Sequence, residues 1–426
     1  MRNLFVVFIL FNTFLLNGQD TLNVVHYNLL NYGNITSYCH NGNNNINDKD
    51  AYLKTIINYL KPDIFTVNEI SKSESIHQHL LDQVLNTSGV DYYEKANFIK
   101  VAESDLVNML YYNKDKLALH SHMIAQSYIR DIDVYKLFYL SDDLDKGDTA
   151  FVICVVAHLK SSSGSTNENK RKVMAENTMN YLNEYDDDNN YLMMGDFNLY
   201  SNTEDAYQQF LYYSNTSLRF GDPVDQYGEW HNNSYYSDYH TQSTHATSNG
   251  CASYGGMDDR FDFILISNSI KNGTKTVQYI NDTYWAVGQD GHHYNKSVNS
   301  LPTNTSVPSD VLDALAYNSD HLPVFLKLFI DKTLDVQEIR PDIFDHITMI
   351  NPANNYLDLK IDVKERCELK LGIYNVFGNL LIKNQIQLQE GDNQISTSIQ
   401  WLKPGLYIVQ LKDENSNTVV LKLLKK

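Results

Sequence analysis

A short apolar run that stops abruptly at a glycine is the feature that most constrains the fold of this chain. The run extends from Tyr191 to Met194 and ends at Gly195, after which Asp196 and Asn198 stand two positions apart. A run of this length that ends at a glycine is typical of a buried strand. Residues two apart in extended backbone project from the same face. We therefore predict a buried strand that carries a carboxylate and an amide to one edge of a sheet.

Similar apolar runs recur along the first three quarters of the chain and alternate with segments of helical spacing. We predict strands at residues 21–31, 63–69, 106–112, 133–140, 151–157, 260–267 and 324–330. We predict helices at residues 50–60, 75–85 and 170–185, the first because its apolar residues share one helical face. The polar stretches 201–256 and 281–308 are expected to be long loops. This alternation predicts a layered α/β or α+β domain that ends near residue 330.

The end of the chain has a different pattern. Residues 331–345 show no periodicity and are expected to be a linker. Short alternating strands follow at residues 356–363, 368–375, 380–388, 406–412 and 419–424. Turn residues separate several of these strands, so we predict a small all-β sandwich. It contains no cluster of acids and histidines, and we expect no chemistry there.

The N-terminus has the features of a secretory signal. Arg2 precedes an apolar run at residues 4–16, and small polar residues follow near 17–19. No other apolar run reaches the length of a membrane span. We therefore expect a soluble protein outside the cytoplasm.

The charge balance restricts the partners of the chain. Its 52 acidic and 34 basic residues give a net charge of −18. This charge opposes non-specific binding to polyanions. A polyanionic substrate is compatible with it where a divalent cation supplies local positive charge.

The four cysteines are Cys39, Cys154, Cys251 and Cys367. They form no Cys-x-x-Cys pair, which argues against a zinc or redox motif. Cys154 lies within an apolar run and is predicted to be a buried thiol. Cys39 and Cys251 lie in polar loops, and an oxidising compartment permits a bridge between them.

Six polar groups stand at or near the ends of predicted strands. They are Asn28, Glu69, His158, Asp196 with Asn198, Asp262, and Asp320 with His321. Taken singly, each has a plain structural explanation, such as a carboxylate that caps a helix. Together they supply oxygen ligands for a hard cation, a base for water and donors for developing charge. This combination indicates metal-assisted hydrolysis of a phosphoester.

These groups lie within motifs that resemble those of the endonuclease/exonuclease/phosphatase superfamily, which contains deoxyribonuclease I. The motifs are Tyr27-Asn28, Asn68-Glu69, His158-Leu159, Gly195-Asp-Phe-Asn198, Arg260-Phe-Asp262 and Ser319-Asp-His-Leu-Pro323. They follow the order of the family and cover residues 22–330. The resemblance implies an α+β fold, a four-layer αββα sandwich of two packed mixed sheets flanked by helices.

The resemblance also implies roles around a cation. Glu69 corresponds to the principal Mg²⁺ ligand, with Asn28 and Asp320 beside it; Ca²⁺ or Mn²⁺ are alternative cations. Asp196 corresponds to the residue that orients or deprotonates the attacking water. Asn198 corresponds to the amide that binds the phosphate.

The histidines have implied roles of their own. Asp262 corresponds to the partner that fixes the ring of His321, and His158 to a second histidine that contacts the phosphate. Whether Asp196 or His321 is the base stays open at this point. Arg130 is either a further phosphate ligand or a surface residue paired with a neighbouring aspartate (131 or 133).

The end of the chain resembles the type A sorting domain of type IX secretion. The matching pieces are Asn351-Pro-Ala-Asn-Asn-Tyr-Leu357, Leu371-Gly-Ile-Tyr-Asn-Val-Phe-Gly378, Leu402-Lys-Pro-Gly-Leu-Tyr407 and Leu424-Lys-Lys426. This resemblance implies export by an outer-membrane secretion machinery to the cell surface or beyond. A carbohydrate-binding sandwich is the alternative.

The domain organisation and function follow from these features. We predict a signal peptide at residues 1–19, a catalytic domain at 20–331, a linker at 332–346 and a sorting domain at 347–426. The predicted function is that of a secreted, metal-dependent phosphodiesterase, foremost a nuclease acting on extracellular DNA or RNA. The alternatives are a sphingomyelinase-like phospholipid phosphodiesterase and a surface binding protein on an inactive nuclease scaffold. No motif implies a stable protein partner.

Overall fold

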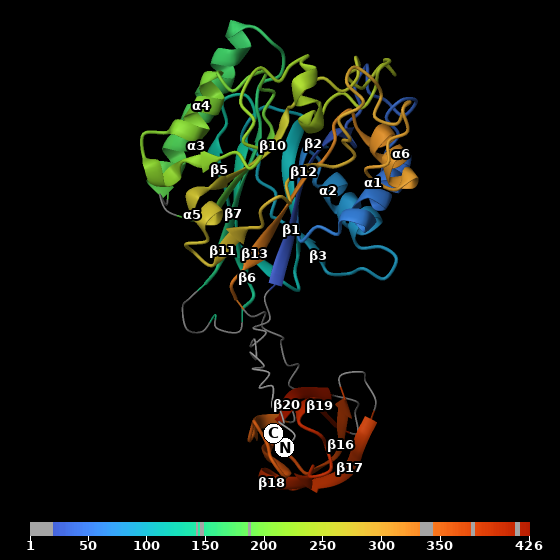
Figure 1. Ribbon diagram of the computed structural model, residues 1–426, viewed down its shortest axis with the longest axis vertical. Coiled ribbons are helices and arrows are strands. Elements are labelled where there is room, and N and C mark those ends of the chain that lie inside the picture. Colours follow the sequence, from blue (N-terminus) through green and yellow to red (C-terminus); the bar gives the residue numbers. More distant parts are fainter. Residues whose placement is uncertain are drawn as a thin grey trace, which may run out of the picture. The chain divides into compact units, whose positions relative to one another are not determined.

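The computed structural model describes residues 20–141, 144, 149–185, 189–332, 344–375, 380–413 and 418–426. The chain divides into two compact units, Met1–Asp335 and Val336–Lys426, which we call the N-terminal and the C-terminal unit (Figure 1). The predicted signal peptide and most of the predicted linker lie outside the described residues. Among the described residues, no helix is long and apolar enough to span a membrane.

The first sheet of the N-terminal unit has seven strands, with β1 and β2 parallel at its centre. The order is β11-β13-β1-β2-β4-β3, and β12 also pairs with β13. The strands are β1 (Asp20–Tyr32), β2 (Ile64–Ser71), β3 (Tyr93–Lys95), β4 (Leu106–Asn113), β11 (Val277–Tyr279), β12 (Trp285–Ala286) and β13 (Val324–Ile330).

The second sheet has six strands in the order β5-β6-β7-β8-β10-β9, with β7 and β8 parallel. The strands are β5 (Leu117–Gln126), β6 (Ile132–Tyr139), β7 (Phe151–His158), β8 (Tyr191–Asp196), β9 (Phe220–Gly221) and β10 (Asp262–Ser267).

Helices cover the outer face of each sheet, as Figure 1 shows. Against the first sheet lie α1 (Ile46–Leu60), α2 (Glu74–Leu80), the π-helical turn η1 (Leu81–Leu85) and α6 (Ser309–Asn318). Against the second lie α3 (Ser165–Tyr185), α4 (Asp205–Tyr212) and α5 (Asn268–Asn272). The short 3-10 turns η3 (Thr216–Leu218) and η4 (Ser234–Tyr239) lie in the loops. The predicted α+β class, with two mixed sheets and flanking helices, is confirmed.

Strand β7 shows why the apolar runs are continuous. Ile153 and Val155 belong to the core shared with α3, whereas Val152, Cys154 and Val156 belong to the core between the two sheets. A strand that lies between two cores is apolar on both faces. The predicted burial of the Cys154 thiol follows from this position and is confirmed.

Several helices differ from the prediction, and helix α1 begins at Ile46 rather than at residue 50. Helix α3 begins at Ser165 rather than Lys170, with Gly164 accepting a bond from the Glu168 N–H at 3.0 Å. Its first residues are polar, so a loop was predicted there, although such residues are favoured in the first turn of a helix. Helix α4 lies within the stretch predicted to be a long loop. Its buried residues, such as Ala206 and Phe210, stand four apart, a signal that the prediction overlooked.

The C-terminal unit consists of two antiparallel sheets around a separate apolar core. One sheet holds β14 (Phe344–Met349), β15 (Tyr356–Val363) and β18 (Gly391–Ser398). The other holds β16 (Cys367–Asn375), β17 (Leu380–Leu388), β19 (Gly405–Lys412) and β20 (Thr418–Lys425). The predicted all-β unit is confirmed; strands β14 and β18 were not predicted.

Candidate active site

The strand pairing brings the six polar groups to one edge of the two sheets. In the second sheet, His158 ends β7 beside Asp196 of the parallel β8, and Asp262 begins the antiparallel β10 opposite Asp196. In the first sheet, Asn28 on β1 pairs in register with the residue before Glu69 on β2. Parallel strands end together, and an antiparallel neighbour begins where they end. Each group therefore reaches the same edge.

The segment before β13 reaches this edge for the same reason. Strand β13 is antiparallel to β1 and starts opposite His26, so Asp320 and His321 lie beside the end of β1. The Ser319 hydroxyl donates to the Asn28 carbonyl at 2.7 Å and fixes this approach. The structure thus brings together all the residues predicted for the site.

A bulge aims Glu69 at the site. The register between β1 and β2 shifts after Asn28, and Glu69 has a φ of 58°. The left-handed region costs a residue with a side chain about 1 kcal/mol. Bulges of this kind redirect side chains next to active sites. Asn198 has a φ of 51°, which asparagine adopts more readily.

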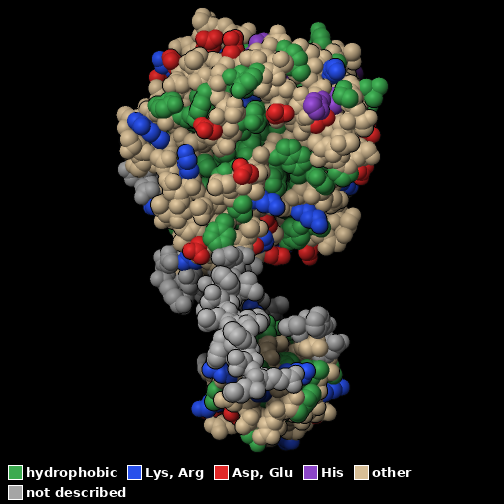
Figure 2. Space-filling model, viewed as in Figure 1, with side chains coloured by type: hydrophobic (Ala, Val, Ile, Leu, Met, Phe, Trp, Pro, Cys, Tyr) green, Lys and Arg blue, Asp and Glu red, His purple; other side chains and the backbone are tan. Residues whose placement is uncertain are grey.

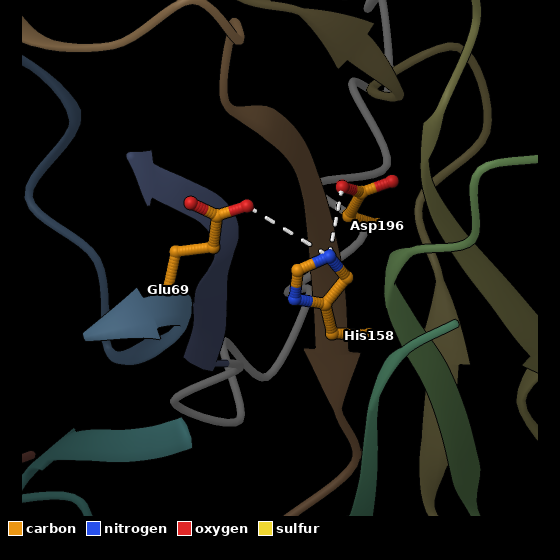
Figure 3. Close-up of side chains that lie close together, drawn as sticks. All are labelled: Glu69, His158 and Asp196. Carbon is orange, nitrogen blue, oxygen red and sulfur yellow. Dashed lines mark ion pairs between the residues drawn. The ribbon is translucent and has the colours of Figure 1, made fainter. Parts of the chain in front are cut away.

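Glu69, His158 and Asp196 form the centre of the site (Figure 3). The His158 Nε2 lies 3.5 Å from Asp196 Oδ2 and 3.8 Å from Glu69 Oε1. Burial raises the pKa of Glu69, and the charge of Asp320 raises it further. Burial, together with the charge of Arg130, holds the pKa of His158 well below its usual value. Buried acids that repel one another, beside a neutral imidazole, are a donor set that fits a divalent cation.

Asn28 holds these carboxylates through its amide nitrogen. Its Nδ2 donates to Asp196 Oδ2 at 3.1 Å and to Glu69 Oε1 at 3.3 Å. Its Oδ1 accepts from the Leu30 N–H at 3.0 Å. In this orientation Asn28 joins the two acids, and the oxygen that a cation requires faces the backbone.

Asp262 holds the ring of His321. The Asp262 Oδ2 lies 2.7 Å from His321 Nδ1, and both side chains are buried. The His321 Nε2 faces Asp196 Oδ2 at 3.8 Å and the Gln242 amide at 2.6 Å. Burial alone would lower the pKa of His321, but the charges of Asp262 and Asp196 outweigh it and raise this pKa well above its usual value.

Asp196 is held at its other oxygen. Its Oδ1 accepts from the Asn198 side chain at 2.8 Å and from the Asn198 N–H at 3.0 Å. Burial raises the pKa of Asp196 to about 7, an effect that His321 opposes and that Asp262 and Glu69 reinforce. An acid with a pKa near neutrality is suited to accept a proton from water.

Arg130 lies at the same cavity. Its Nη1 donates to the Leu159 carbonyl at 2.8 Å, directly after His158. Asp131 instead accepts backbone bonds from Val101 and Ala102, and Asp133 pairs with a histidine. Within the described parts of the chain, no ion pair joins Arg130 to either aspartate. The guanidinium therefore faces the site.

Most of these side chains line one polar cavity of about 430 Å³, and Asn28 and Asp262 stand behind it and hold residues of its lining. Asp320 also lies on it, with its Oδ2 accepting from the Ser253 N–H at 2.8 Å and its Oδ1 4.0 Å from His321 Nε2. A larger cavity of about 600 Å³ lies on the C-terminal unit, where Asp358 and Lys360 are the charged residues of its lining. That lining lacks a cluster of titratable groups able to do chemistry.

Sequence reasoning missed two residues that shape the site. The Asn68 Oδ1 accepts from the Asp196 N–H at 2.8 Å and so joins the two sheets. Asn68 belongs to the motif Asn68-Glu69 at the end of the predicted strand, but no role was predicted for it. Gln242 lies in an irregular loop, and no pattern in the sequence indicates its contact with His321.

The loop histidines are not part of this cavity. His240 is buried and bonds the Trp230 carbonyl at 2.9 Å, and His231 pairs with Asp259 at 2.6 Å. His245 lines a separate cavity of about 210 Å³. These three histidines of the loop at residues 227–257 therefore lie outside the candidate active site.

Comparisons with known proteins concern the two units separately. Residues 351–426 match the family described as secretion system C-terminal sorting domain. This match confirms the predicted sorting domain and indicates type IX secretion to the cell surface or the extracellular space. None of the curated protein sequences matches the chain.

Several solved structures are similar to the chain. Zebrafish (D. rerio) TDP2, complexed with single strand DNA product, has 14% identity and a TM-score of 0.44, covering 72% of this chain and 98% of its own. An endonuclease/exonuclease/phosphatase from Beutenbergia cavernae has 10% identity and a TM-score of 0.41, covering 94% and 99%. The human Nocturnin catalytic domain with bound sulfate has 13% identity and a TM-score of 0.41, covering 73% and 97%.

Proposed function

We propose that the protein is a secreted, metal-dependent phosphodiesterase, and foremost a nuclease. The observation that carries this proposal is the convergence of three acids, two of them buried, with two histidines and one arginine on a single polar cavity. Acids alone would describe a cation site. The positively charged guanidinium of Arg130 and the imidazole of His321 add the hydrogen-bond donors that a phosphate needs.

The cation would be held by Glu69 with Asp320, next to Asp196 and His158. Mg²⁺ suits this set because it prefers oxygen ligands; Ca²⁺ and Mn²⁺ share the preference. When bound, the cation supplies positive charge against the phosphate. Asn28 keeps Glu69 and Asp196 in place by donating to both.

The side chains then divide the remaining work. Asp196 orients the attacking water and accepts its proton, since its pKa lies near neutrality. His321, kept protonated by Asp262, donates from Nε2 to a phosphoryl oxygen. Arg130 binds another oxygen of the phosphate. These pKa directions favour Asp196 over His321 as the base.

Asn198 and His158 complete the contacts with the phosphate. Asn198 holds Asp196 through its amide nitrogen at 2.8 Å, and the same nitrogen donates to the Leu159 carbonyl at the longer distance of 3.5 Å. A phosphate oxygen would replace that carbonyl as the acceptor of the second N–H. His158 is neutral, since its pKa is depressed, and it donates a hydrogen bond without adding charge.

The charge of the surface agrees with a need for local positive charge. On the face drawn in Figure 2, the basic side chains of the described residues are scattered and form no continuous basic surface. A polyanion would therefore be held mainly at the cavity. In the polar stretch 281–308, Trp285 is the side chain that a phospholipid-binding loop could use as a membrane contact. Trp285 instead pairs with Phe325 in β12 and packs against the core, which disfavours the phospholipid alternative.

The test offers several phosphodiesters to the purified protein. Plasmid DNA, RNA, sphingomyelin and bis(p-nitrophenyl) phosphate would each be incubated with Mg²⁺ and then with EDTA. We expect cleavage of a nucleic acid that requires Mg²⁺. Cleavage of lipid with intact plasmid and RNA would replace the nuclease proposal by the phospholipid one. Absence of any turnover would favour a binding protein on an inactive scaffold.

Variants assign the activity to this site. His158→Ala and Asp196→Ala should each lose most of the turnover while the far-UV and near-UV circular dichroism stays unchanged. The matched control is Asp282→Ala, because Asp282 is an exposed acid on another loop. Activity within a fewfold of wild type in either site variant would refute the assignment.

A further inference from the structure

A disulfide joins two loops that border the candidate active site. Cys39 and Cys251 are bonded across a sequence separation of 212 residues. Cys251 lines the 430 Å³ cavity, as does Tyr38 next to Cys39. A second tie runs parallel to the disulfide, since the Asn43 amide donates to the Asn249 carbonyl at 3.2 Å. The two loops are thus fastened together at the rim of the cavity.

The bonded loop continues directly to a predicted cation ligand. Asn249 folds the segment into a compact turn by accepting from the N–H groups of Cys251 at 2.9 Å and Ala252 at 2.8 Å. Ser253 follows, and its N–H donates to Asp320 Oδ2 at 2.8 Å. Only Ala252 therefore separates the disulfide-bonded Cys251 from Ser253, the residue that holds the carboxylate.

This bond leaves Asp320 with one oxygen for a ligand. Its Oδ2 is occupied by the Ser253 N–H, and its Oδ1 faces His321 Nε2 at 4.0 Å. Asp320 is 4% exposed, so it cannot turn freely toward solvent. Groups that orient a ligand in this way change metal affinity or activity about 10–100-fold when they are removed.

We infer that the Cys39–Cys251 disulfide positions Asp320 for the divalent cation, so that the cation site is complete only in the oxidised chain. The inference rests on the proposed function, because that proposal assigns the cation to Asp320. Opening the disulfide removes the covalent restraint on the segment 249–253 and leaves the donor to Asp320 held by hydrogen bonds alone, from Asn43 to the Asn249 carbonyl and from the Ser243 hydroxyl to the Ser253 carbonyl. The dependence suits an exported protein, because disulfides persist in oxidising surroundings.

The test measures cation binding without substrate. Free Mn²⁺ is followed by electron paramagnetic resonance in titrations of the full chain, oxidised or reduced with a water-soluble phosphine. The phosphine takes oxygen from water to become its oxide, and the disulfide becomes two thiols. We expect the Kd for Mn²⁺ to rise at least about tenfold on reduction. The double variant Cys39→Ser/Cys251→Ser should bind as weakly as the reduced chain and should not respond to the phosphine. A Kd changed by less than twofold in a folded, reduced chain overturns the inference.

A double-mutant cycle with Asp320 distinguishes the positioning of this carboxylate from a general loosening of the two loops. In an Asp320→Ala background, opening the disulfide should weaken Mn²⁺ binding no further, because the affected ligand is already gone. A full additional loss there overturns the inference. Ser253→Pro keeps the disulfide and removes the donor N–H, so it covers the case in which the cysteine variants do not fold. It should reproduce the weaker binding; unchanged affinity would also overturn the inference.

The outcomes also distinguish this inference from the proposed function. Disulfide-dependent Mn²⁺ binding without hydrolysis of any phosphodiester would refute the function and support the positioning of Asp320. Hydrolysis and Mn²⁺ binding that are both indifferent to the disulfide would support the function and overturn the inference.

Discussion

Replacing Asp262 by asparagine tests how His321 is used. The Asp262 Oδ2 lies 2.7 Å from His321 Nδ1, and the Asp262 side chain is fully buried. Asparagine has nearly the same shape, so the packing is retained while the negative charge is lost. The carboxylate contributes to the raised pKa of His321, and this pKa should therefore fall in the variant.

The expected loss of activity is large. Replacing a buried aspartate behind a catalytic histidine by asparagine has lowered kcat by about 10⁴-fold in a serine protease. Here Asp196 also supports the imidazolium of His321, so a smaller loss is expected. We expect kcat to fall about 10²–10³-fold, or about 3–4 kcal/mol of transition-state stabilisation. The KM should change little, because Arg130 and the cation still bind the phosphate.

The assay is the pH profile of bis(p-nitrophenyl) phosphate hydrolysis with saturating Mg²⁺. In the wild type, activity should rise as Asp196 loses its proton and fall as His321 loses its own. In Asp262→Asn the high-pH limb should move to lower pH. The control variant Asp282→Asn should match the wild type throughout. A kcat within about threefold of wild type, with an unmoved high-pH limb, would refute the role of Asp262.

Three further predictions concern stability and the cation. Arg260 and Asp222 form a buried pair with two contacts of 2.8 Å, so Arg260→Leu should lower the free energy of unfolding by about 3–5 kcal/mol in urea titrations; a loss below about 1 kcal/mol would contradict this. Burial lowers the pKa of His26 to about 4 in the folded chain, against 6.5 in the unfolded chain. As the pH falls below 6.5, the unfolded chain binds a proton that the folded chain does not, so the free energy of unfolding decreases. Between pH 7 and pH 5 this contributes about 2 kcal/mol, which His26→Gln should abolish in paired urea titrations; equal pH dependence in both proteins would count against it. EDTA should abolish phosphodiester hydrolysis and Mg²⁺ restore it, and undiminished turnover in EDTA would rule out the metal-dependent mechanism.

The site could be anticipated because its residues lie where strands end. The apolar runs predict the strands, and the strand pairing determines where their polar ends meet. Because β7 is parallel to β8 and β10 is antiparallel to both, the ends of β7 and β8, at His158 and Asp196, lie beside the start of β10 at Asp262. Asp262 is the informative case. It stands near the start of its predicted strand, and Asp320 likewise precedes a strand, whereas Glu69 and Asp196 stand at strand ends. Only antiparallel neighbours bring both kinds of position to the same edge.

The parts that escaped prediction depend on contacts without periodicity. Gln242 reaches His321 from an irregular loop whose course follows isolated bonds, such as those between its backbone and Asp259. Asn28 illustrates a different limit. Its position was predicted, but the direction of its amide depends on Leu30 N–H, which claims the oxygen and turns the nitrogen toward the acids.

The sequence predicts that Cys39 and Cys251 can form a disulfide, whereas the role of this disulfide depends on the geometry of the loops. Export makes a disulfide possible, and the apolar run around Cys154 removes that residue from the candidates, but neither argument says what the bridge does. Its consequence depends on Ser253, whose N–H meets Asp320 only because the turn at Asn249 brings the chain back to the cavity. A bridge placed a few residues away would fasten the same loops without constraining the carboxylate. The effect of this disulfide on the cation therefore has to be measured at Asp320, where the loop and the strand edge meet.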